Sequence, residues 1–365
     1  MKILVLADGA SSHTERYVRQ LRVQGCEVVA ASLEPGSVID VALTRSALGD
    51  FASYALLAPE LRELIVSEKP DIINSHFATA YGFAAARCRR RFGDLNAAWA
   101  LTVWGSDILV SPNKSLFHRW RVRYALSQAQ IIVADSTYLE EQTKLYTKGA
   151  VSVIPWGIER EYVGSDEALK EKSNAWSDSV IRVMAPRPHE RLYRNDLLLE
   201  GLAPLLRSSR IALTVSASGS MLGPFRKRAN ELEVNNNIAY YDTLARDEYI
   251  GLLKEHHVYA SASSSDSSPV SMIEALALGV APLMADHPGL NDFLDGPLKA
   301  PGLFDSAKPE TVVEKLEALM AQSSAERLKM FIHNRNRVRE MGVHEDNIIQ
   351  TINLYQWLMC ENKHS

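Results

Sequence analysis

The chain has 365 residues, of which 46% are hydrophobic and 23% are charged. This length is too great for one ordinary hydrophobic core, and the composition excludes disordered and fibrous proteins. The net charge of −4 at pH 7 excludes a global positive field that would draw the protein to nucleic acid. No window approaches the roughly 20 apolar residues that a membrane-spanning helix needs. We therefore expect a globular protein of two domains.

The first apolar run, Met1–Ala7, stops at Asp8. It is too short for a signal peptide and indicates a buried first strand. The three cysteines are far apart and odd in number, so they suit neither a disulfide framework nor a metal site: Cys26, Cys88 and Cys360. Scarce cysteine is typical of a reducing compartment, so we expect a cytoplasmic location.

The first half of the chain alternates continuous apolar strands with amphipathic helices. Strands are predicted at residues 3–7, 27–32, 71–74, 98–103, 131–134 and 151–154. Helices are predicted at residues 12–24, 59–67, 82–91, 118–129 and 137–146. This alternation predicts a parallel sheet that is covered by helices on both faces.

Arginines cluster within this half, although the chain as a whole is acidic. The cluster comprises Arg87, Arg89, Arg90, Arg91, Arg119, Arg121 and Arg123. The carboxylates between them are Asp94 and Asp107. Two interpretations stay open: a solvated helix face, or a patch that meets anionic lipid headgroups at the inner face of a membrane.

Residues 161–179 are polar and weakly patterned, and they are predicted to be a linker. The alternation then restarts, with strands predicted at residues 181–185, 211–216, 238–241, 258–261 and 281–284. Helices are predicted at residues 196–206, 224–233, 246–256 and 270–278, and the tail over residues 323–358 is predicted to be helical. The predicted domains are residues 1–165 and 166–342, with a terminal helix over residues 343–360 that folds back onto the first domain.

The expected fold is therefore two doubly wound, Rossmann-like α/β domains that face each other across a cleft. Such folds bind ligands beyond the carboxyl ends of their strands. A dinucleotide oxidoreductase would carry Gly-x-Gly-x-x-Gly after the first strand, but this chain has Asp8-Gly9-Ala10-Ser11-Ser12-His13. The sequence thus argues against that class.

The most informative stretch runs from residue 261 to residue 283, where a strand ends in a serine-rich loop that enters a helix. Free amides at the helix start, around Val270 and Ser271, suit a phosphate, together with the preceding Ser267 and Pro269. Asp266 lies at the mouth of the loop. Glu274 lies about one turn into the helix, where its carboxylate can accept two hydrogen bonds from a ribose diol.

On these residues the chain resembles family 4 of the GT-B glycosyltransferases. That family carries a Glu-x₇-Glu motif and then an Ala-Leu/Met-Ala-x-Gly-x-x-Pro run. Here Asp266 and Glu274 occupy the two acidic positions, followed by Ala275-Leu276-Ala277-Leu278-Gly279-Val280-Ala281-Pro282. The resemblance implies that Asp266 contacts the donor sugar with an arm one methylene shorter than usual. The alternative interpretation is a helix-capping Asp266 and a solvated Glu274.

The resemblance also implies a pair of cations for the donor diphosphate. Members of the family have Gly-Arg after a strand and then Lys-Gly. Here the strand leads to Pro186-Arg187, and Arg194 matches the second position, with Arg191 as a competitor for it. Two fixed cations facing a pyrophosphate stabilise the leaving group without a metal. Surface arginines are the alternative.

The first-domain residues that match the family are Asp107, His76 and Gly9. Trp104-Gly105-Ser106-Asp107 stands where many members have His-Gly-x-Asp. Trp104 cannot titrate, so no general base is expected there. Asp107 is predicted to line the donor–acceptor junction, or else to cap a helix. His76 matches a histidine near the acceptor, or is a satisfied polar group. Gly9 and His13 belong to a loop that approaches the donor or the acceptor in the family.

The resemblance implies a retaining glycosyltransferase that moves a sugar from a nucleotide-sugar donor to a glycan, lipid-linked or small-molecule acceptor. The residues assigned to catalysis are His76, Asp107, Arg187 and Asp266. No cofactor and no metal are expected. No carboxylate is an obvious nucleophile, so a front-face route assisted by the leaving phosphate is the preferred hypothesis. A sugar-nucleotide 2-epimerase and a non-catalytic nucleotide-sugar-binding module remain alternatives.

Overall fold

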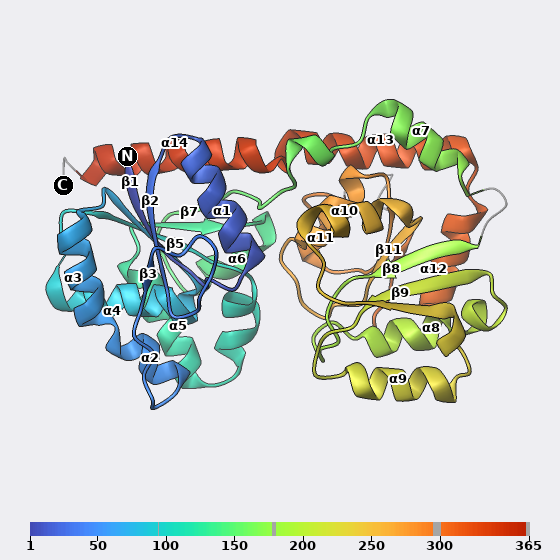
Figure 1. Ribbon diagram of the computed structural model, residues 1–365, viewed down its shortest axis with the longest axis horizontal. Helices are drawn as coiled ribbons and strands as arrows, with labels where there is room; N and C mark the ends of the chain where they lie inside the picture. Colours follow the sequence, from blue (N-terminus) through green and yellow to red (C-terminus); the bar gives the residue numbers. More distant parts are fainter. Residues whose placement is uncertain (94, 177–179, 295–300, 363–365) are drawn as a thin grey trace. The chain divides into compact units, whose positions relative to one another are not determined.

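The computed structural model describes residues 1–93, 95–176, 180–294 and 301–362. The chain divides into two compact units (Figure 1). Unit 1 comprises Met1–Pro155 and the C-terminal residues from Glu345 onward, and unit 2 comprises Trp156–His344. Among the described residues, no helix is both long enough and apolar enough to cross a membrane.

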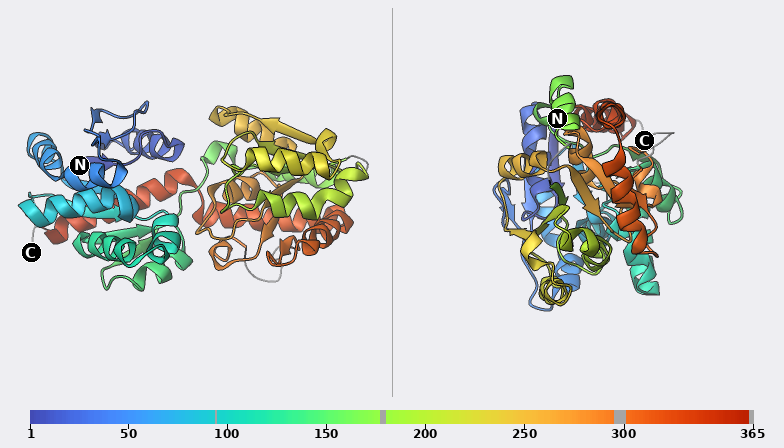
Figure 2. Two further views of the ribbon diagram at one scale, coloured as in Figure 1. Left: turned by 90° about the horizontal axis from the view of Figure 1, so that it is seen from below. Right: turned by 90° about the vertical axis from the view of Figure 1, so that its right-hand side faces the viewer.

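Unit 1 is built on a seven-stranded parallel sheet in the order β3-β2-β1-β4-β5-β6-β7. Its strands are β1 (Lys2–Leu6), β2 (Glu27–Ser32), β3 (Val41–Ala42), β4 (Ile72–His76), β5 (Ala98–Thr102), β6 (Ile131–Ala134) and β7 (Val151–Val153). Its helices are α1 (Ser12–Val23), α2 (Asp50–Leu56), α3 (Ala58–Glu68), α4 (Gly82–Phe92), α5 (Leu116–Gln128) and α6 (Thr137–Lys144). The apolar strands are buried because helices cover both faces of the sheet (Figure 2).

Unit 2 repeats this plan with a six-stranded sheet in the order β10-β9-β8-β11-β12-β13. Its strands are β8 (Ile181–Ala185), β9 (Ile211–Ser216), β10 (Ile238–Tyr241), β11 (Val258–Ser261), β12 (Ala281–Ala285) and β13 (Leu303–Phe304). Its helices are α7 (Asp166–Asn174), α8 (Asn195–Arg207), α9 (Leu222–Glu231), α10 (Arg246–Glu255), α11 (Val270–Ala277), α12 (Glu310–Ala321) and α13 (Ser324–Met341). The predicted fold class of two doubly wound domains is confirmed.

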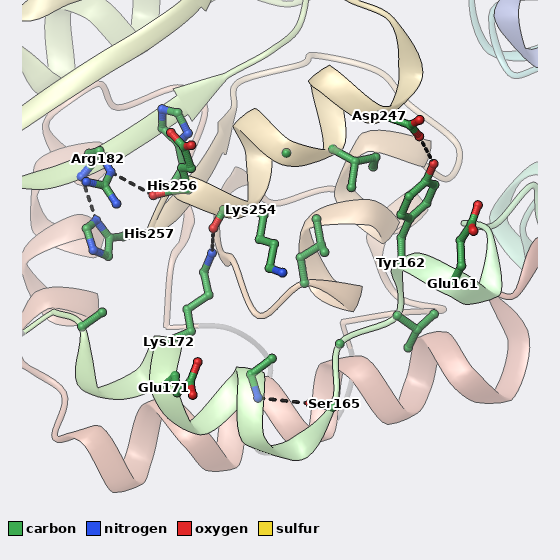
Figure 3. A pocket seen from close by; sticks show the side chains of 18 residues that line it. Glu161, Tyr162, Ser165, Glu171, Lys172, Arg182, Asp247, Lys254, His256 and His257 are labelled. Carbon is green, nitrogen blue, oxygen red and sulfur yellow. Dashed lines mark hydrogen bonds between the residues drawn. The ribbon is translucent and has the colours of Figure 1, made fainter.

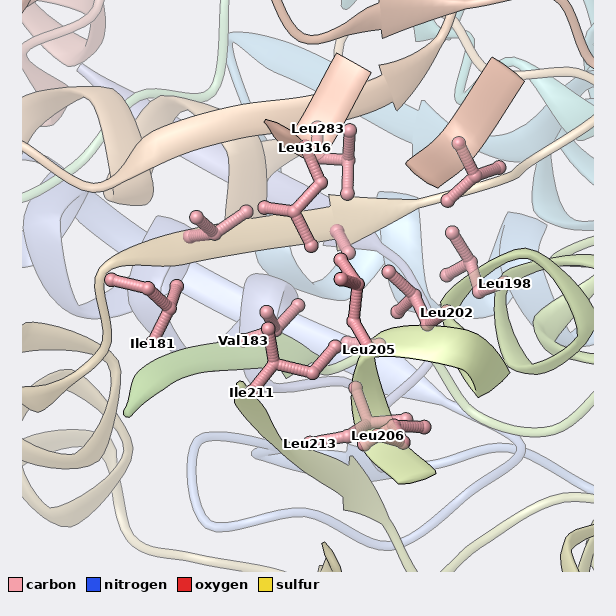
Figure 4. Packing of buried hydrophobic residues seen from close by; sticks show 14 of the residues in the cluster. Ile181, Val183, Leu198, Leu202, Leu205, Leu206, Ile211, Leu213, Leu283 and Leu316 are labelled. Carbon is pink, nitrogen blue, oxygen red and sulfur yellow. The ribbon is translucent and has the colours of Figure 1, made fainter. Parts of the chain in front are cut away.

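The core of unit 2 joins one face of its sheet to the helices α8 and α12 (Figure 4). Val183 of β8, Leu202 of α8, Leu213 of β9, Leu283 of β12 and Leu316 of α12 are each 0–1% exposed. Each such side chain contributes about 1.5–3 kcal/mol by leaving water. This packing fixes the strand ends from which the loops of the candidate site emerge.

The predicted linker over residues 161–179 is wrong for residues 166–174, because α7 occupies them. Ser165 caps this helix, since its side chain accepts a hydrogen bond from the Ala168 amide. Leu169 is fully buried in the core of unit 2. One buried leucine in a polar stretch gives too weak a periodicity to reveal the helix. Residues 177–179 lie outside the described residues.

The chain passes between the units after Pro155 and after His344. Within unit 2, hydrogen bonds join the segments next to these two crossings. The Ile158 amide donates to the Gly342 carbonyl, and the His344 amide donates to the Ile158 carbonyl, both at 2.8 Å. The backbone of Gly157 has φ of +74°, and a Cβ there would lie 2.5 Å from the Gly342 oxygen. The two units divide after Pro155 and after His344, whereas the boundaries predicted from the sequence are residues 165 and 342. The terminal helix is α14 (His344–Asn362), of which all but the first residue belongs to unit 1.

Candidate functional site

The candidate site of unit 2 lies at the carboxyl edge of its sheet, where β8 is flanked by β9 and β11. The chain leaves β8 toward β9 on one side, while β11 lies on the other, so the strand order reverses between β8 and β11. Open α/β sheets bind ligands at this switch point. The loops that follow these two strands carry Arg187 and Asp266.

Arg187 and Asp266 form an ion pair, with Nη2 of the arginine 2.6 Å from Oδ2 of the aspartate. Both side chains are largely buried, at 20% and 15% exposure. The guanidinium also lies 4.2 Å from the centre of the Tyr193 ring, and its buried Nε has no partner among the described residues. Burial opposes the charge on Arg187, but the Asp266 carboxylate outweighs it, so the Arg187 pKa is raised. An incoming diphosphate would compete with Asp266 for this cation.

The start of α11 offers unsatisfied donors beside this ion pair. The amides of Met272 and Ile273 donate to the Pro269 carbonyl, at 3.0 and 3.2 Å. In the described part of the chain, the amides of Val270 and Ser271 have no acceptor. The buried Oγ of Ser268 also lacks a partner there. Free amides and a helix dipole that converge on one point are suited to an anion.

Glu274 lies one turn further along α11 and is only 3% exposed. Its Oε1 lies 2.5 Å from Nη1 of Arg246, whose Nη2 lies 2.6 Å from Oε2 of Glu159. Glu274 is therefore buried and bound, so the alternative interpretation of a solvated side chain is wrong. One guanidinium orients it, and the Tyr249 ring lies close enough for the Glu274 charge to raise the Tyr249 pKa further beyond the effect of burial.

The site residues predicted for unit 2 thus lie in one region, and Ser271 and Arg194 complete the set. Ser271 joins it through its hydroxyl, which lies 2.9 Å from the hydroxyl of Tyr259. Arg194 stands at the N-terminus of α8 in a left-handed conformation, with φ of 48°. Its half-buried guanidinium has no ion-pair partner in the part of the chain that the structure describes, whereas Arg191 is exposed.

Two residues of this region were not found from the sequence, His287 and Arg246. His287 follows β12, and both its ring nitrogens are buried without a partner among the described residues. Burial lowers the His287 pKa, while the nearby Asp266 opposes that shift, so the ring is neutral at pH 7. The loop after His287 packs closely against the Asp266 loop, since a Cβ on Gly289 would lie 2.4 Å from the Asp266 carbonyl oxygen. Its position after a central strand was the signal available in the sequence.

In unit 1, Asp107 is 1% exposed and bridges two loops. Its Oδ1 accepts from the Trp104 amide at 2.9 Å, and its Oδ2 accepts from the Ala78 amide at 2.7 Å. Burial raises the Asp107 pKa to about 6, and these amides oppose the shift. It does not cap the short helix that contains it, whose N-cap is Gly105. Its role at a donor–acceptor junction stays a prediction, and this packing favours positioning.

His76 is also buried, at 0% exposure, beneath the Trp104 ring. Its Nε2 lies 2.8 Å from Oδ1 of Asn74, and burial lowers the His76 pKa to about 3. Contact of His76 with an acceptor therefore stays a prediction. Gly9 lies at the reversal point of this sheet, where a Cβ would lie 2.3 Å from the Glu34 oxygen. Close packing of two loops thus explains why a glycine stands at position 9.

A separate cavity of about 650 Å³ lies between α7 and α10 (Figure 3). Lys172 points across it and donates to the Lys254 carbonyl. Burial and the neighbouring Arg182 and Lys254 lower the Lys172 pKa to about 7. Arg182 lies on β8 near its amino end, so this cavity is at the opposite edge of the sheet from the candidate site and includes none of the predicted residues.

Comparison with known proteins agrees with this geometry. Residues 2–136 match the family described as Glycosyl transferase 4-like, and residues 166–338 match Glycosyl transferases group 1. The putative teichuronic acid biosynthesis glycosyltransferase TuaC of Bacillus subtilis (strain 168) is 24% identical over 303 residues, which are 78% of this chain and 74% of TuaC.

Two solved structures share the fold. Sucrose-phosphate synthase from Thermosynechococcus elongatus is 13% identical, with a TM-score of 0.81 over 99% of this chain and 100% of that chain. Anabaena HepE, in complex with UDP-glucose, is 13% identical, with a TM-score of 0.76 over 97% of this chain and 99% of that chain. The matched segments, the two doubly wound units and the residues gathered around α11 lead to one conclusion: this chain belongs to the GT-B glycosyltransferases of group 1.

Proposed function

We propose that this glycosyltransferase is a retaining enzyme that transfers a sugar from a nucleotide-sugar donor to a glycan or lipid-linked acceptor in the synthesis of a polysaccharide. The donor type is supported by HepE, a relative in fold that was solved with UDP and with UDP-glucose. The polysaccharide is supported by TuaC, which is named for teichuronic acid biosynthesis. A uridine nucleotide is accordingly the first donor to test.

The observation that carries the proposal is the convergence of three groups at one switch point. The Arg187 guanidinium, the free amides of Val270 and Ser271, and the Glu274 carboxylate lie within one region of unit 2. In the proposed complex the cation and the amides hold the diphosphate, and the Glu274 carboxylate accepts from the ribose. This arrangement matches the diphosphate and the ribose of a nucleoside diphosphate.

In the proposed reaction the bond between the anomeric carbon and the diphosphate breaks, and both electrons stay with the leaving oxygen. Arg187, together with Arg194, stabilises the negative charge that develops there. The acceptor hydroxyl attacks from the same face and passes its proton to the leaving phosphate, which retains the anomeric configuration. Asp266, released from Arg187, takes hydrogen bonds from the donor sugar. No cofactor or metal enters this scheme.

The test begins with a thermal-shift screen of the full chain against UDP, GDP, ADP, TDP and their sugars. We expect one nucleotide to raise the melting temperature, because ligand binding to the folded state stabilises it. Transfer is then followed as nucleotide release with a panel of acceptors, and NMR reads the anomeric configuration of the product. Nucleotide-sugar turnover without acceptor would replace the proposal with the 2-epimerase. Binding without turnover in any acceptor panel would replace it with a non-catalytic module.

A further inference from the structure

Unit 1 exposes a cluster of large apolar side chains that its own core does not explain. Leu116, Phe117 and Trp120 on α5 are 81%, 47% and 48% exposed, and Phe51 on α2 is 44% exposed. We call these four residues the aromatic patch. Positions 116 and 120, and positions 117 and 120, face the same side of a helix. The opposite face of α5 is buried through Val122, Ala125 and Leu126.

The aromatic patch is continuous and rests on a rigid base. The Phe51 and Phe117 rings lie 5.2 Å apart, and the Phe117 and Trp120 rings lie 5.8 Å apart. Beneath them, the buried Arg121 guanidinium lies 4.9 Å from the Phe51 ring and 5.1 Å from the Phe83 ring, and it donates to the Thr79 carbonyl. The helices α2, α4 and α5 that carry these residues lie next to one another in unit 1 (Figure 1).

Positive charge surrounds the aromatic patch. Residues 87–123 contain eight arginines and lysines against two aspartates. One of these aspartates, Asp107, is buried. The exposed cations are Arg87, Arg90, Arg91, Lys114, Arg119 and Arg123, and none of them pairs with a carboxylate in the part of the chain that the structure describes. The chain as a whole has a net charge of −4, so this charge is concentrated here.

We propose that the aromatic patch and its surrounding arginines dock unit 1 onto the surface of a bilayer that contains anionic lipid. The occupant follows from the chemistry of the patch. Exposed Trp, Phe and Leu side chains beside Arg and Lys are the pattern of segments that lie in the membrane interface. Unpaired cations next to the apolar tip match anionic headgroups. An apolar partner protein would not require this excess of positive charge.

The test uses the full chain without any sugar donor, so its outcome is independent of the proposed transfer reaction. The chain is sedimented with vesicles of phosphatidylcholine, with and without phosphatidylglycerol. We expect binding to the anionic vesicles only, and weaker binding as salt is added, because salt screens the headgroup attraction. Tryptophan emission should shift to the blue on binding. That shift should persist in Trp357→Phe, which removes the other exposed tryptophan of unit 1, and disappear in Trp120→Phe.

Two sets of variants separate the apolar and the charged contributions. The double variant Leu116→Ser with Phe117→Ser should lower vesicle partitioning by about tenfold or more, because two inserted side chains are lost. Arg119→Glu with Arg123→Glu should lower it by about tenfold or more and remove the preference for phosphatidylglycerol. The matched controls are Leu145→Ser and Lys148→Glu, exposed residues of unit 1 outside the patch, which should bind as the parent does.

Because the substituted residues are exposed, the melting temperature should not change in these variants. Absence of vesicle binding by the parent chain would overturn the proposal. So would equal binding by all variants and controls, or an unchanged emission spectrum in the presence of anionic vesicles. A lipid-free dimer that depends on Leu116 and Phe117, without vesicle binding, would assign the patch to a second copy instead.

Discussion

The two units place polar groups at the same topological position but leave them in opposite states. In unit 1, His76 ends β4 and Asp107 follows β5, and both are buried and bound by neighbouring backbone or side-chain groups. In unit 2, Arg187, Ser268 and His287 retain buried polar atoms without a partner among the described residues. Unsatisfied buried polar groups are costly, so they persist where a ligand completes them. The comparison favours unit 2 as the donor-binding unit, although Arg121 of unit 1 also keeps a buried Nε without a partner in the described part of the chain.

The largest effect is expected for Arg187→Ala. Removing a charged donor aimed at a developing anion costs about 2.7–4 kcal/mol, or about 10²–10³-fold in turnover. The turnover of Arg187→Lys should lie between those of Arg187→Ala and the parent, because lysine keeps the charge but loses the guanidinium fork. The measurement is nucleotide release, with Arg207→Ala, an exposed arginine in the last turn of α8, as the control. Equal rates of nucleotide release for Arg187→Ala and the parent would contradict the assignment of Arg187 to the donor diphosphate.

Glu274→Ala should weaken donor binding rather than turnover alone. The loss of hydrogen bonds to a carboxylate costs about 1.5–3 kcal/mol, or about 10–150-fold in the dissociation constant. Arg246 retains Glu159 in this variant, so the fold should survive. Titration calorimetry with the nucleotide found in the screen measures the effect, and the exposed Glu310→Ala serves as the control. Parent-like affinity in Glu274→Ala would remove the ribose assignment.

The fold was largely predictable from the sequence because its strands are continuous apolar runs between helices of clear period. Some elements that were missed carry weak patterns: β3 and β13 have two residues each, and α7 has one buried leucine in a polar stretch. The helices α2 and α12 were missed as well, although α12 buries Val312, Leu316 and Leu319 at helical spacing. Arg187 and Asp266 could be proposed because they lie in the loops that follow predicted strands, and Glu274 because it lies one turn into the predicted helix after the second loop. That Arg246 binds Glu274 depends on the tertiary approach of α10 to α11, which no local pattern encodes.

The buried histidine of unit 1 provides a pH test of the comparison. The His76 pKa of about 3 lies below its unfolded value of roughly 6.5. The contribution of neutral His76 to the free energy of unfolding is therefore fully present above pH 6.5. It decreases as the pH falls, by about 2 kcal/mol from pH 7 to pH 5. Asp107, with a raised pKa of about 6, acts in the opposite direction, since its contribution is lost as the pH rises through 6.

His76→Gln isolates the histidine contribution, because Asp107 is present in both proteins. Urea unfolding at pH 7 and pH 5, followed by tryptophan fluorescence, should show the variant losing about 2 kcal/mol less than the parent on acidification. Identical pH dependence of the two proteins would mean that His76 is accessible and protonated. That result would return it to the acceptor site that the sequence suggests.

The smallest effect is expected at His287, and it separates a ligand contact from a packing role. The neutral ring has two buried nitrogens without a partner among the described residues, and it lies near Arg187 and Asp266. A donor that completes one hydrogen bond there would lose about 1.4 kcal/mol in His287→Phe, seen as an approximately tenfold higher KM with little change in kcat. His287→Gln should recover most of this loss, because its amide can donate and accept. If the ring only fills space, the larger apolar Phe would be tolerated and Gln would gain nothing over it, and the unsatisfied nitrogens of unit 2 would then not mark the donor site.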